Sequence, residues 1–205
     1  MLLLLVAGCA RAVSPPAGAV LVLGDSLSAG YGLPAGTSWP ALLSARMPER
    51  APGWSMVNAA ISGDTTAGGR ARLPALLARE RPVLVLIALG ANDALRGQPL
   101  AASADNLRAM IDAAKQAGAQ VGLIGMQIPP NFGPVYTRQF RDLYKNVARE
   151  TGVPLLDFLL EPVAADAANF QDDGLHPTAA AQAPISDHVA QWLHAAFGLP
   201  ALAGK

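Results

Sequence analysis

The sequence predicts one α/β domain in which a parallel β-sheet lies between two layers of helices. Short aliphatic runs alternate with longer helical stretches, as they do in βαβ units. One run, residues 83–89, is aliphatic throughout, which is typical of a strand buried on both faces. The chain has 205 residues, of which 52% are hydrophobic, so it is long and apolar enough to form one folded core.

Five strands are expected in chain order, at residues 21–24, 55–58, 83–89, 121–125 and 154–157, the second being the weakest run. Because crossovers between parallel strands are right-handed, only a few doubly wound orders are open, and the order 2-1-3-4-5 is favoured. This is a flavodoxin-like, three-layer α/β/α sandwich. Functional sites in such sheets lie beyond the carboxyl ends of the strands.

Five helices are expected, at residues 38–46, 66–79, 103–117, 137–150 and 179–197. Ser38 is the expected cap of the first helix, with Pro40 in its first turn. Pro74 and two glycines are expected to disturb the start of the second helix. The third has the clearest apolar stripe and ends before Gly118. Residues 20–198 are the expected domain, and residues 199–205 the expected tail.

The N-terminus is expected to precede the domain. Residues 1–12 form an apolar, signal-like leader, and residues 13–19 a short linker with prolines and a glycine. Residues 6–9 resemble a bacterial lipoprotein cleavage box, which makes Cys9 a lipidation candidate. Residues 10–12 offer a competing site for ordinary cleavage, and a retained apolar N-terminus is the third alternative. We therefore expect an exported bacterial protein, either free in the periplasm or anchored to a membrane as a lipoprotein.

Composition narrows the range of partners. Fifteen basic and fifteen acidic residues give a formal net charge of zero, so there is no basic excess to neutralise nucleic-acid phosphates. No window of eighteen apolar residues occurs, so no spanning helix is expected, and an N-terminal lipid would be the one route to a membrane. The single cysteine cannot form an intramolecular disulfide. A monomer is expected.

The candidate catalytic residues fall in loops at one edge of the predicted sheet. Ser26 follows the first strand, Gly63 the second and Asn92 the third, while Asp173 and His176 precede the last helix. Because the carboxyl ends of parallel strands share one edge, these loops are expected to converge.

These residue types are those of nucleophilic acyl transfer. A serine hydroxyl needs a base, and His176 is the candidate because His188 and His194 fall within the last helix. A carboxylate must orient the imidazole; Asp173 is three residues away, and Asp172 competes for this role. The backbone N–H groups of Ser26 and Gly63 and the side-chain amide of Asn92 could supply three donors to an oxyanion.

The loops at 94–100 and 128–135 are the ones expected to contact substrate. Met126, Ile128 and Phe132 could offer an apolar wall for an acyl chain. Three aspartates near the site are expected to be structural: Asp25 supports its loop, and Asp64 and Asp93 form hydrogen bonds. Four arginines are expected to form a solvated face: Arg70, Arg72, Arg79 and Arg81.

Four blocks together resemble the SGNH hydrolase superfamily, the GDSL esterases and lipases. They are Gly24-Asp25-Ser26-Leu27, Gly63, Gly90-Ala91-Asn92-Asp93 and Asp173-Gly174-Leu175-His176, and the resemblance runs from about residue 20 to 193. Residues 61–66, 95–97 and 126–133 are similar to the bacterial thioesterase/lysophospholipase/arylesterase branch. The resemblance implies Ser26 as nucleophile, Gly63 and Asn92 as oxyanion donors, His176 as base and Asp173 as its partner. It also implies an α/β/α fold and neither a metal nor an organic cofactor.

The expected function is hydrolysis of small-molecule carboxylic esters or thioesters through an acyl-enzyme on Ser26. A carbohydrate deacetylase on the same scaffold is the alternative among enzymes. A flavodoxin-like binding protein is the alternative outside them, but Asp25 places a carboxylate where that protein needs a phosphate cradle. An inactive relative that binds lipid is the third alternative.

Overall fold

The computed structural model describes residues 17–204 and contains a five-stranded parallel sheet in the order β2-β1-β3-β4-β5, which confirms the predicted topology. The strands are β1 (Ala19–Gly24), β2 (Ser55–Asn58), β3 (Leu84–Ala88), β4 (Gln120–Ile124) and β5 (Leu155–Leu156). In the register of the sheet, Val20 of β1 lies between Met56 of β2 and Leu84 of β3. The predicted leader, residues 1–12, and the lipidation candidate Cys9 lie outside the described residues.

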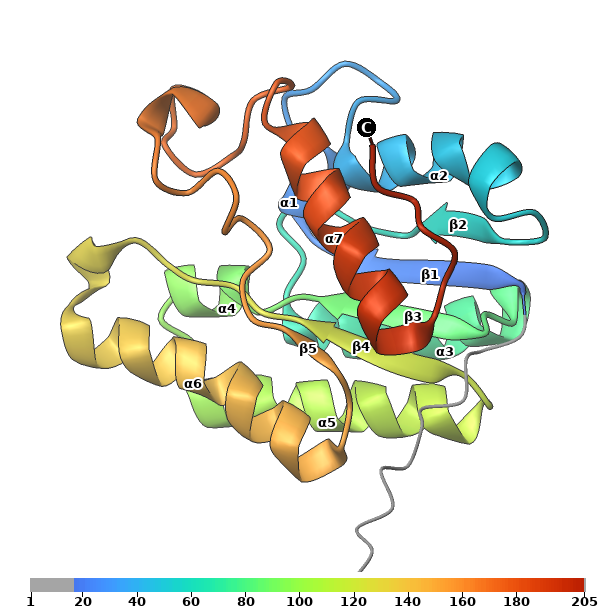
Figure 1. The fold of residues 1–205 in the computed structure, drawn as a ribbon. Coiled ribbons are helices and arrows are strands. Elements are labelled where there is room, and N and C mark those ends of the chain that lie inside the picture. The colour runs from blue at the N-terminus through green and yellow to red at the C-terminus, as the bar shows by residue number, and fades with distance from the viewer. Residues whose placement is uncertain (1–16, 205) are drawn as a thin grey trace, which may run out of the picture.

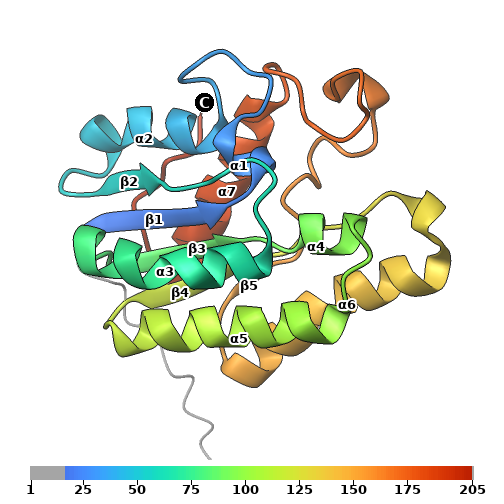
Figure 2. The same ribbon diagram turned by 180° about the vertical axis from the view of Figure 1, so that it is seen from behind.

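Helices cover both faces of the sheet and form the predicted outer layers. In Figure 1, α7 (Gln182–Phe197) and α2 (Trp39–Arg50) cover one face. Figure 2 shows α3 (Thr66–Glu80) and α5 (Leu100–Gln116) on the other face, where α6 (Pro134–Thr151) packs against α5. The remaining elements are short: α1 (Ser26–Ala29), α4 (Ala91–Leu95) and the 3₁₀ turns η1 (Pro130–Phe132) and η2 (Ala167–Asn169).

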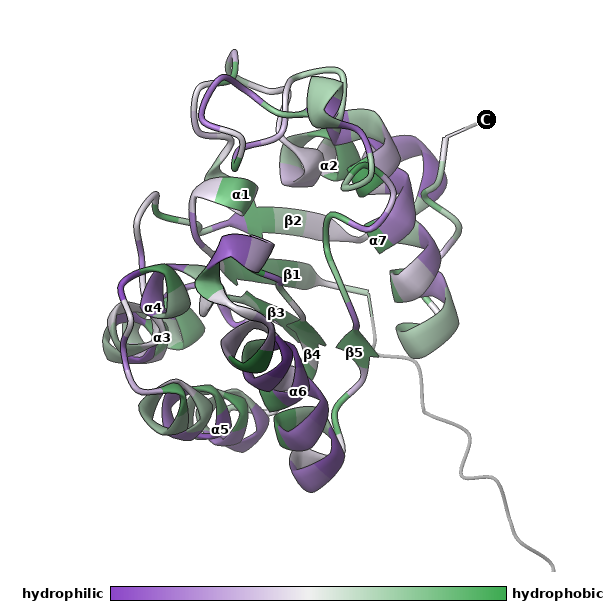
Figure 3. Ribbon diagram, turned by 90° about the vertical axis from the view of Figure 1, so that its left-hand side faces the viewer, coloured by the Kyte–Doolittle hydropathy of each residue, from purple (hydrophilic) through white to green (hydrophobic). Residues whose placement is uncertain are grey.

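The central strands form the core because they are aliphatic on both faces. All five residues of β3 and the last five of β1 are buried. The central strands β1 and β3 are green in the hydropathy colouring of Figure 3, whereas the helices alternate between green and purple. Full burial of one large aliphatic side chain contributes roughly 1.5–3 kcal/mol, so these two strands anchor the edge on which the site is built.

The structure corrects three expectations. Helix α3 is not disturbed at its start: the Thr65 side chain caps it by accepting from the Gly68 N–H at 3.2 Å, and the helix continues through Pro74. Ser38 is the N-cap residue of α2, as expected, but its side chain makes no capping hydrogen bond. Residues 199–204 are not a free tail, because Leu199 and Leu202 are fully buried and the Leu202 carbonyl accepts from Arg46 at 3.2 Å.

Within residues 17–204, no helix combines the length and the hydropathy that crossing a bilayer requires.

Candidate active site

Ser26 lies at the turn where β1 leads into the one-turn helix α1. Asp25 caps that helix, its Oδ1 accepting a hydrogen bond from the Leu27 N–H at 3.0 Å. A β-carbon at Gly24 would lie 2.8 Å from the Ser28 side chain, so the sharp turn from strand to helix requires glycine there. The turn holds the Ser26 hydroxyl at the carboxyl edge of the sheet.

Asp173 and His176 lie in one tight turn before α7. The Asp173 Oδ1 accepts from the backbone N–H groups of Leu175 at 2.9 Å and His176 at 3.0 Å, while Gly174 takes a positive φ of 66°. The other carboxylate oxygen, Oδ2, lies 2.6 Å from His176 Nδ1. A single carboxylate therefore fixes both the backbone of the turn and the orientation of the imidazole.

The imidazole reaches the serine across 150 residues of chain. His176 Nε2 lies 2.8 Å from Ser26 Oγ. The pKa of the Asp173 carboxyl group is lowered from 3.8 to about 2. The His176 backbone N–H is the largest cause, and the Leu175 N–H and the imidazole add to it against the opposing effect of burial. Asp173 therefore stays ionised at neutral pH. It is this aspartate, rather than Asp172, that contacts the imidazole.

The two other predicted oxyanion donors lie beside the serine. Ser26, Gly63, Asn92 and His176 all line one cavity of about 430 Å³. Gly63 has a φ of 78°, which favours glycine, and its carbonyl accepts from Arg96 Nη2 at 2.9 Å. The half-buried amide of Asn92 comes from the first turn of α4 and donates to Asp25 Oδ2 over a long 3.4 Å. The structure thus brings all five predicted catalytic positions together.

The cavity suits an apolar group. Most of the surface that its lining exposes is apolar, and Ile128 is one of the lining residues, as the sequence predicts. Met126 and Phe132 do not line it. Met126 is buried in the core directly after β4, and Phe132 lies on the exposed turn η1. Of the three expected wall residues, only Ile128 is in position to contact an acyl chain in this cavity.

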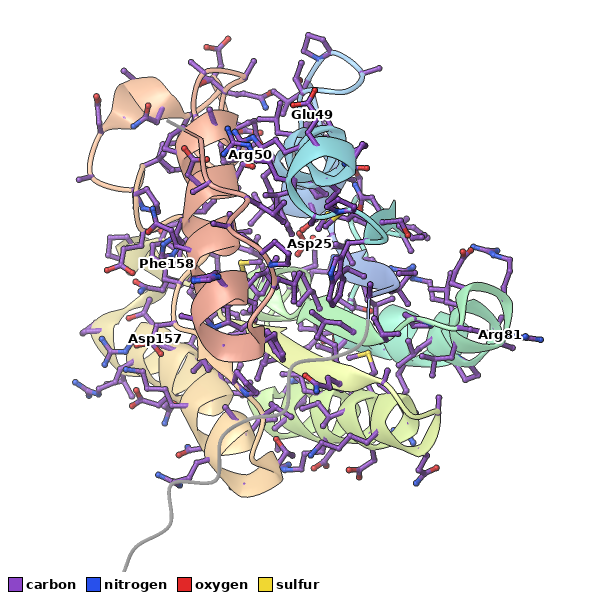
Figure 4. All side chains as sticks on the ribbon, turned by 45° about the vertical axis from the view of Figure 1, so that its right-hand side comes forward. Asp25, Glu49, Arg50, Arg81, Asp157 and Phe158 are labelled. Atoms are coloured by element: carbon purple, nitrogen blue, oxygen red, sulfur yellow. The ribbon has the colours of Figure 1, made fainter. Side chains whose placement is uncertain are left out.

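Asp25 is a buried carboxyl group in the wall of the same cavity. Figure 4 shows it in the interior of the molecule, whereas Arg81 extends outward at the far end of α3. Burial raises the pKa of Asp25 from 3.8 to about 6, while the Leu27 N–H and the nearby His176 counteract part of this rise. The predicted supporting role is consistent with its two contacts, to the α1 backbone and to Asn92.

A second buried aspartate holds α4, and with it Asn92. The carboxylate of Asp93 accepts from the Thr66 backbone N–H at 2.9 Å, from the Thr66 hydroxyl at 2.5 Å and from the Ser103 hydroxyl at 3.2 Å. These bonds join the first turns of α3, α4 and α5. The predicted structural role of Asp93 is confirmed by this network.

Arg72 does not belong to a solvated face, contrary to expectation. Its guanidinium pairs with Asp64 at 2.8 Å and donates to the carbonyls of Ala59 and Gly24. Ala59 directly follows β2, and Gly24 is the last residue of β1. A partly buried arginine therefore joins the two strand ends that precede Gly63 and Ser26, a contact between segments that the sequence pattern does not reveal.

Tyr31 is a site residue that sequence reasoning missed. Its ring centroid lies 4.6 Å from that of His176, with the planes tilted by 41°. Gln171 joins the two loops, since its Nε2 donates to the Tyr31 carbonyl at 2.9 Å. The only available signal was an aromatic residue in the loop after the serine block, which does not by itself indicate contact with a residue 145 positions away.

The two remaining histidines lie apart from the catalytic cavity. His188 contacts the Phe158 carbonyl and His194 the Leu199 carbonyl. Among residues 17–204, no cluster of three histidine, cysteine, aspartate or glutamate side chains is arranged to hold a metal ion.

Comparison with known proteins places this geometry in a family. The sequence profile of the GDSL-like lipase/acylhydrolase family matches residues 22–183. The chain is 45% identical over 190 residues to esterase TesA of Pseudomonas aeruginosa, covering 91% of this chain and 94% of that protein. It is 44% identical over 174 residues to thioesterase 1/protease 1/lysophospholipase L1 of Escherichia coli K12, covering 85% and 82%.

A solved structure agrees with these sequence matches. The psychrotrophic esterase EstA from Pseudoalteromonas sp., in a structure inhibited by monoethylphosphonate, superposes with a TM-score of 0.83 at 36% identity, covering 87% of this chain and 97% of that one. The resemblance to the SGNH hydrolases in the four sequence blocks is confirmed. The chain belongs to the GDSL-like lipase/acylhydrolase family.

Proposed function

We propose that this protein hydrolyses carboxylic esters or thioesters through an acyl-enzyme on Ser26. The observation that carries the proposal is a continuous chain of contacts: Ser26 Oγ lies 2.8 Å from His176 Nε2, and His176 Nδ1 lies 2.6 Å from Asp173. These separations allow a proton to pass from the hydroxyl to the imidazole. The relatives named esterase and thioesterase support the same reaction class.

In the first half-reaction, Ser26 Oγ attacks the carbonyl carbon while its proton moves to His176 Nε2. Negative charge then develops on the carbonyl oxygen, where the N–H groups of Ser26 and Gly63 and the amide of Asn92 act as donors. One donor of this kind contributes about 3–4 kcal/mol to the transition state. The imidazolium next protonates the leaving oxygen or sulfur, the carbonyl re-forms, and the acyl group remains on Ser26.

In the second half-reaction, His176 takes a proton from water and the resulting hydroxide attacks the acyl-enzyme. The imidazolium then returns its proton to Ser26 Oγ, and the carboxylic acid leaves. Asp173 acts throughout by accepting the Nδ1–H and stabilising the imidazolium, which it can do because its pKa of about 2 keeps it ionised.

The character of the cavity favours an acyl ester over a sugar acetate. A sugar needs several polar partners, whereas most of the surface exposed in this cavity is apolar. Five of its lining residues have large aliphatic side chains, namely Leu27, Leu95, Ile128, Leu160 and Leu175. We therefore place the acyl chain in this cavity and set the carbohydrate deacetylase aside.

The test uses p-nitrophenyl esters of increasing chain length with wild type and Ser26→Ala. We expect hydrolysis by the wild type and a loss of at least about 10³-fold in Ser26→Ala. A phosphonate ester reagent should inactivate the wild type and add its mass to the peptide that contains Ser26. Full activity in folded Ser26→Ala would refute the nucleophile assignment.

A further inference from the structure

A second hollow adjoins the catalytic cavity. It has a volume of about 310 Å³, and Gln127 and Ile128 line both spaces. We call it the arginine hollow, because Arg138 and Arg141, with Thr137, form its side on α6. Pro130 and Pro134 complete its lining. Gln127 and Ile128 therefore form a boundary that the arginine hollow shares with the catalytic cavity.

The arginine hollow lies at the catalytic edge of the sheet. Tyr136 lies in the first turn of α6, and its hydroxyl donates to the Ala94 carbonyl of α4 at 3.2 Å. Helix α4 also carries the oxyanion donor Asn92. Figure 1 shows the first turns of α6 at the same end of the molecule as α4. The position of the hollow relative to the oxyanion donors is thus fixed by a direct contact.

The charge of the arginine hollow is positive and is not neutralised by its own lining. No acidic side chain lines it, and none occurs in α6 between Pro134 and Arg141. Arg141 pairs with its neighbour Asp142 at 3.4 Å, with both side chains about half exposed, and such pairs are weak. Within the described part of the chain, Arg138 has no hydrogen bond or ion pair.

This arrangement contrasts with arginines that serve the fold. Arg46 is bound to Asp187 at 2.5 Å, and Arg108 to Glu150 at 2.8 Å and Asp105 at 2.9 Å. Two arginines three residues apart on one helix, facing a hollow with no carboxylate, can instead direct their N–H groups to a ligand. The planar guanidinium fork matches the oxygens of a phosphate group.

We propose that the arginine hollow binds a phosphate group carried by the leaving group of the substrate. The proposal rests on the proposed function and narrows it: the acyl chain occupies the catalytic cavity, Ser26 attacks the carbonyl, and the phosphate of the departing alcohol or thiol is held by Arg138 and Arg141. The preferred substrates are then acyl esters or thioesters with a phosphate-bearing leaving group.

The test compares substrates that differ only in the phosphate-bearing part. One pair is octanoyl-coenzyme A against S-octanoyl-N-acetylcysteamine, both thioesters. The other is a lysophosphatidylglycerol against a monoacylglycerol with the same acyl chain. For each pair, kcat/KM of the phosphate-bearing substrate is divided by kcat/KM of the neutral substrate. Comparing this ratio between enzyme variants removes the difference in intrinsic reactivity between the two substrates. The two pairs distinguish nucleotide phosphates from a lipid headgroup as the source.

We expect Arg138→Ala/Arg141→Ala to lower this ratio by about tenfold or more in at least one pair, mostly through KM. Arg138→Glu/Arg141→Glu should lower it further, and the double lysine variant should retain part of it. The matched control is Arg149→Ala, an exposed arginine in the last turn of α6 that contacts Asn146. Its ratio should equal that of the wild type.

An unchanged ratio in both pairs, with the neutral substrates still hydrolysed, would overturn the phosphate site alone. Equal losses in Arg149→Ala would overturn it too, because the effect would then come from overall charge. If wild type hydrolyses none of the four substrates, or folded Ser26→Ala hydrolyses them equally well, the proposed function fails and the phosphate site with it.

Discussion

Asp25 connects the nucleophile turn to an oxyanion donor. Its Oδ1 accepts from the Leu27 N–H at 3.0 Å and its Oδ2 from the Asn92 amide at 3.4 Å. One buried carboxylate therefore touches both the helix that begins with Ser26 and the side chain expected to face the substrate oxygen. Its contribution to catalysis is indirect, through the position of Asn92.

Asp25→Asn should impair turnover more than substrate binding. An asparagine can still accept from the Leu27 N–H, but its NH₂ group would face the NH₂ group of Asn92, and two donors repel. We expect kcat on a p-nitrophenyl ester to fall about tenfold, with KM changed much less. The matched control is Asp166→Asn, since Asp166 also caps a short helix, accepting from the Ala168 N–H at 2.9 Å. Equal kcat values for Asp25→Asn and wild type would contradict this role.

Tyr31 covers one side of the catalytic base. Its ring lies 4.6 Å from that of His176, while its own side chain is 53% exposed. The imidazolium formed during the reaction faces the electron-rich ring, an interaction worth about 0.5–1 kcal/mol at an exposed position.

Tyr31→Ala should therefore lower kcat about two- to fivefold, because the ring contacts the catalytic base. KM and thermal stability should change little, because the Tyr31 side chain is largely exposed. Tyr31→Phe keeps the ring and should restore kcat, which distinguishes a ring contact from a hydroxyl role. Kinetics on a neutral ester and a thermal melt measure both. A defect that affects KM alone would instead assign Tyr31 to substrate binding.

At the scale of elements, α4 depends on Gly90. This residue precedes α4 with a φ of 124°, and an added β-carbon would lie 2.5 Å from the hydroxyl of the fully buried Tyr144. That hydroxyl donates to the Leu89 carbonyl at 3.0 Å. Gly90 thus joins β3 to α4 in a backbone conformation that other residues rarely adopt, and it lies too close to Tyr144 to leave room for a side chain.

Gly90→Ala should lower the free energy of unfolding by about 1–3 kcal/mol and reduce kcat, because α4 carries Asn92 and would have to shift. Gly97→Ala is the matched control: Gly97 also has a positive φ, 64°, but a β-carbon there would meet no atom within 4 Å. Its cost should be near 1 kcal/mol without loss of kcat. Urea unfolding and ester kinetics test both variants. Equal stability losses would show that Tyr144 accommodates the added carbon.

The same elements show what the sequence can predict. β1 and β3 are predicted because continuous aliphatic runs mark strands buried on both faces. The helices α1 and α4 have four and five residues, too few for a helical period, so no pattern reveals them. Ser26 and Asn92 are predicted from their place after strands. Tyr31, Arg72 and the arginine hollow are not, because they depend on contacts between distant loops and helices.

For the molecule as a whole, a few carboxyl groups give stability a definite dependence on pH. The N–H groups of its turn lower the pKa of Asp173. The Gly204 N–H and Arg46 lower the pKa of Asp187. In both residues, burial opposes this decrease. Their stabilisation is complete above the unfolded value of 3.8 and is lost as pH falls toward the folded value, about 2 for Asp173. Stability therefore rises with pH in this acid range.

Asp25 has the opposite effect at higher pH. Its folded pKa is about 6 against 3.8 unfolded, so between these values the native state holds a proton that the unfolded state has lost, and stability falls as pH rises. The decrease amounts to about 3 kcal/mol. Urea unfolding of wild type should thus show a maximum near pH 4 and a decline to about pH 7. Asp25→Asn should lack the decline, whereas Asp166→Asn should keep the wild-type profile. An identical decline in Asp25→Asn would assign it to other groups.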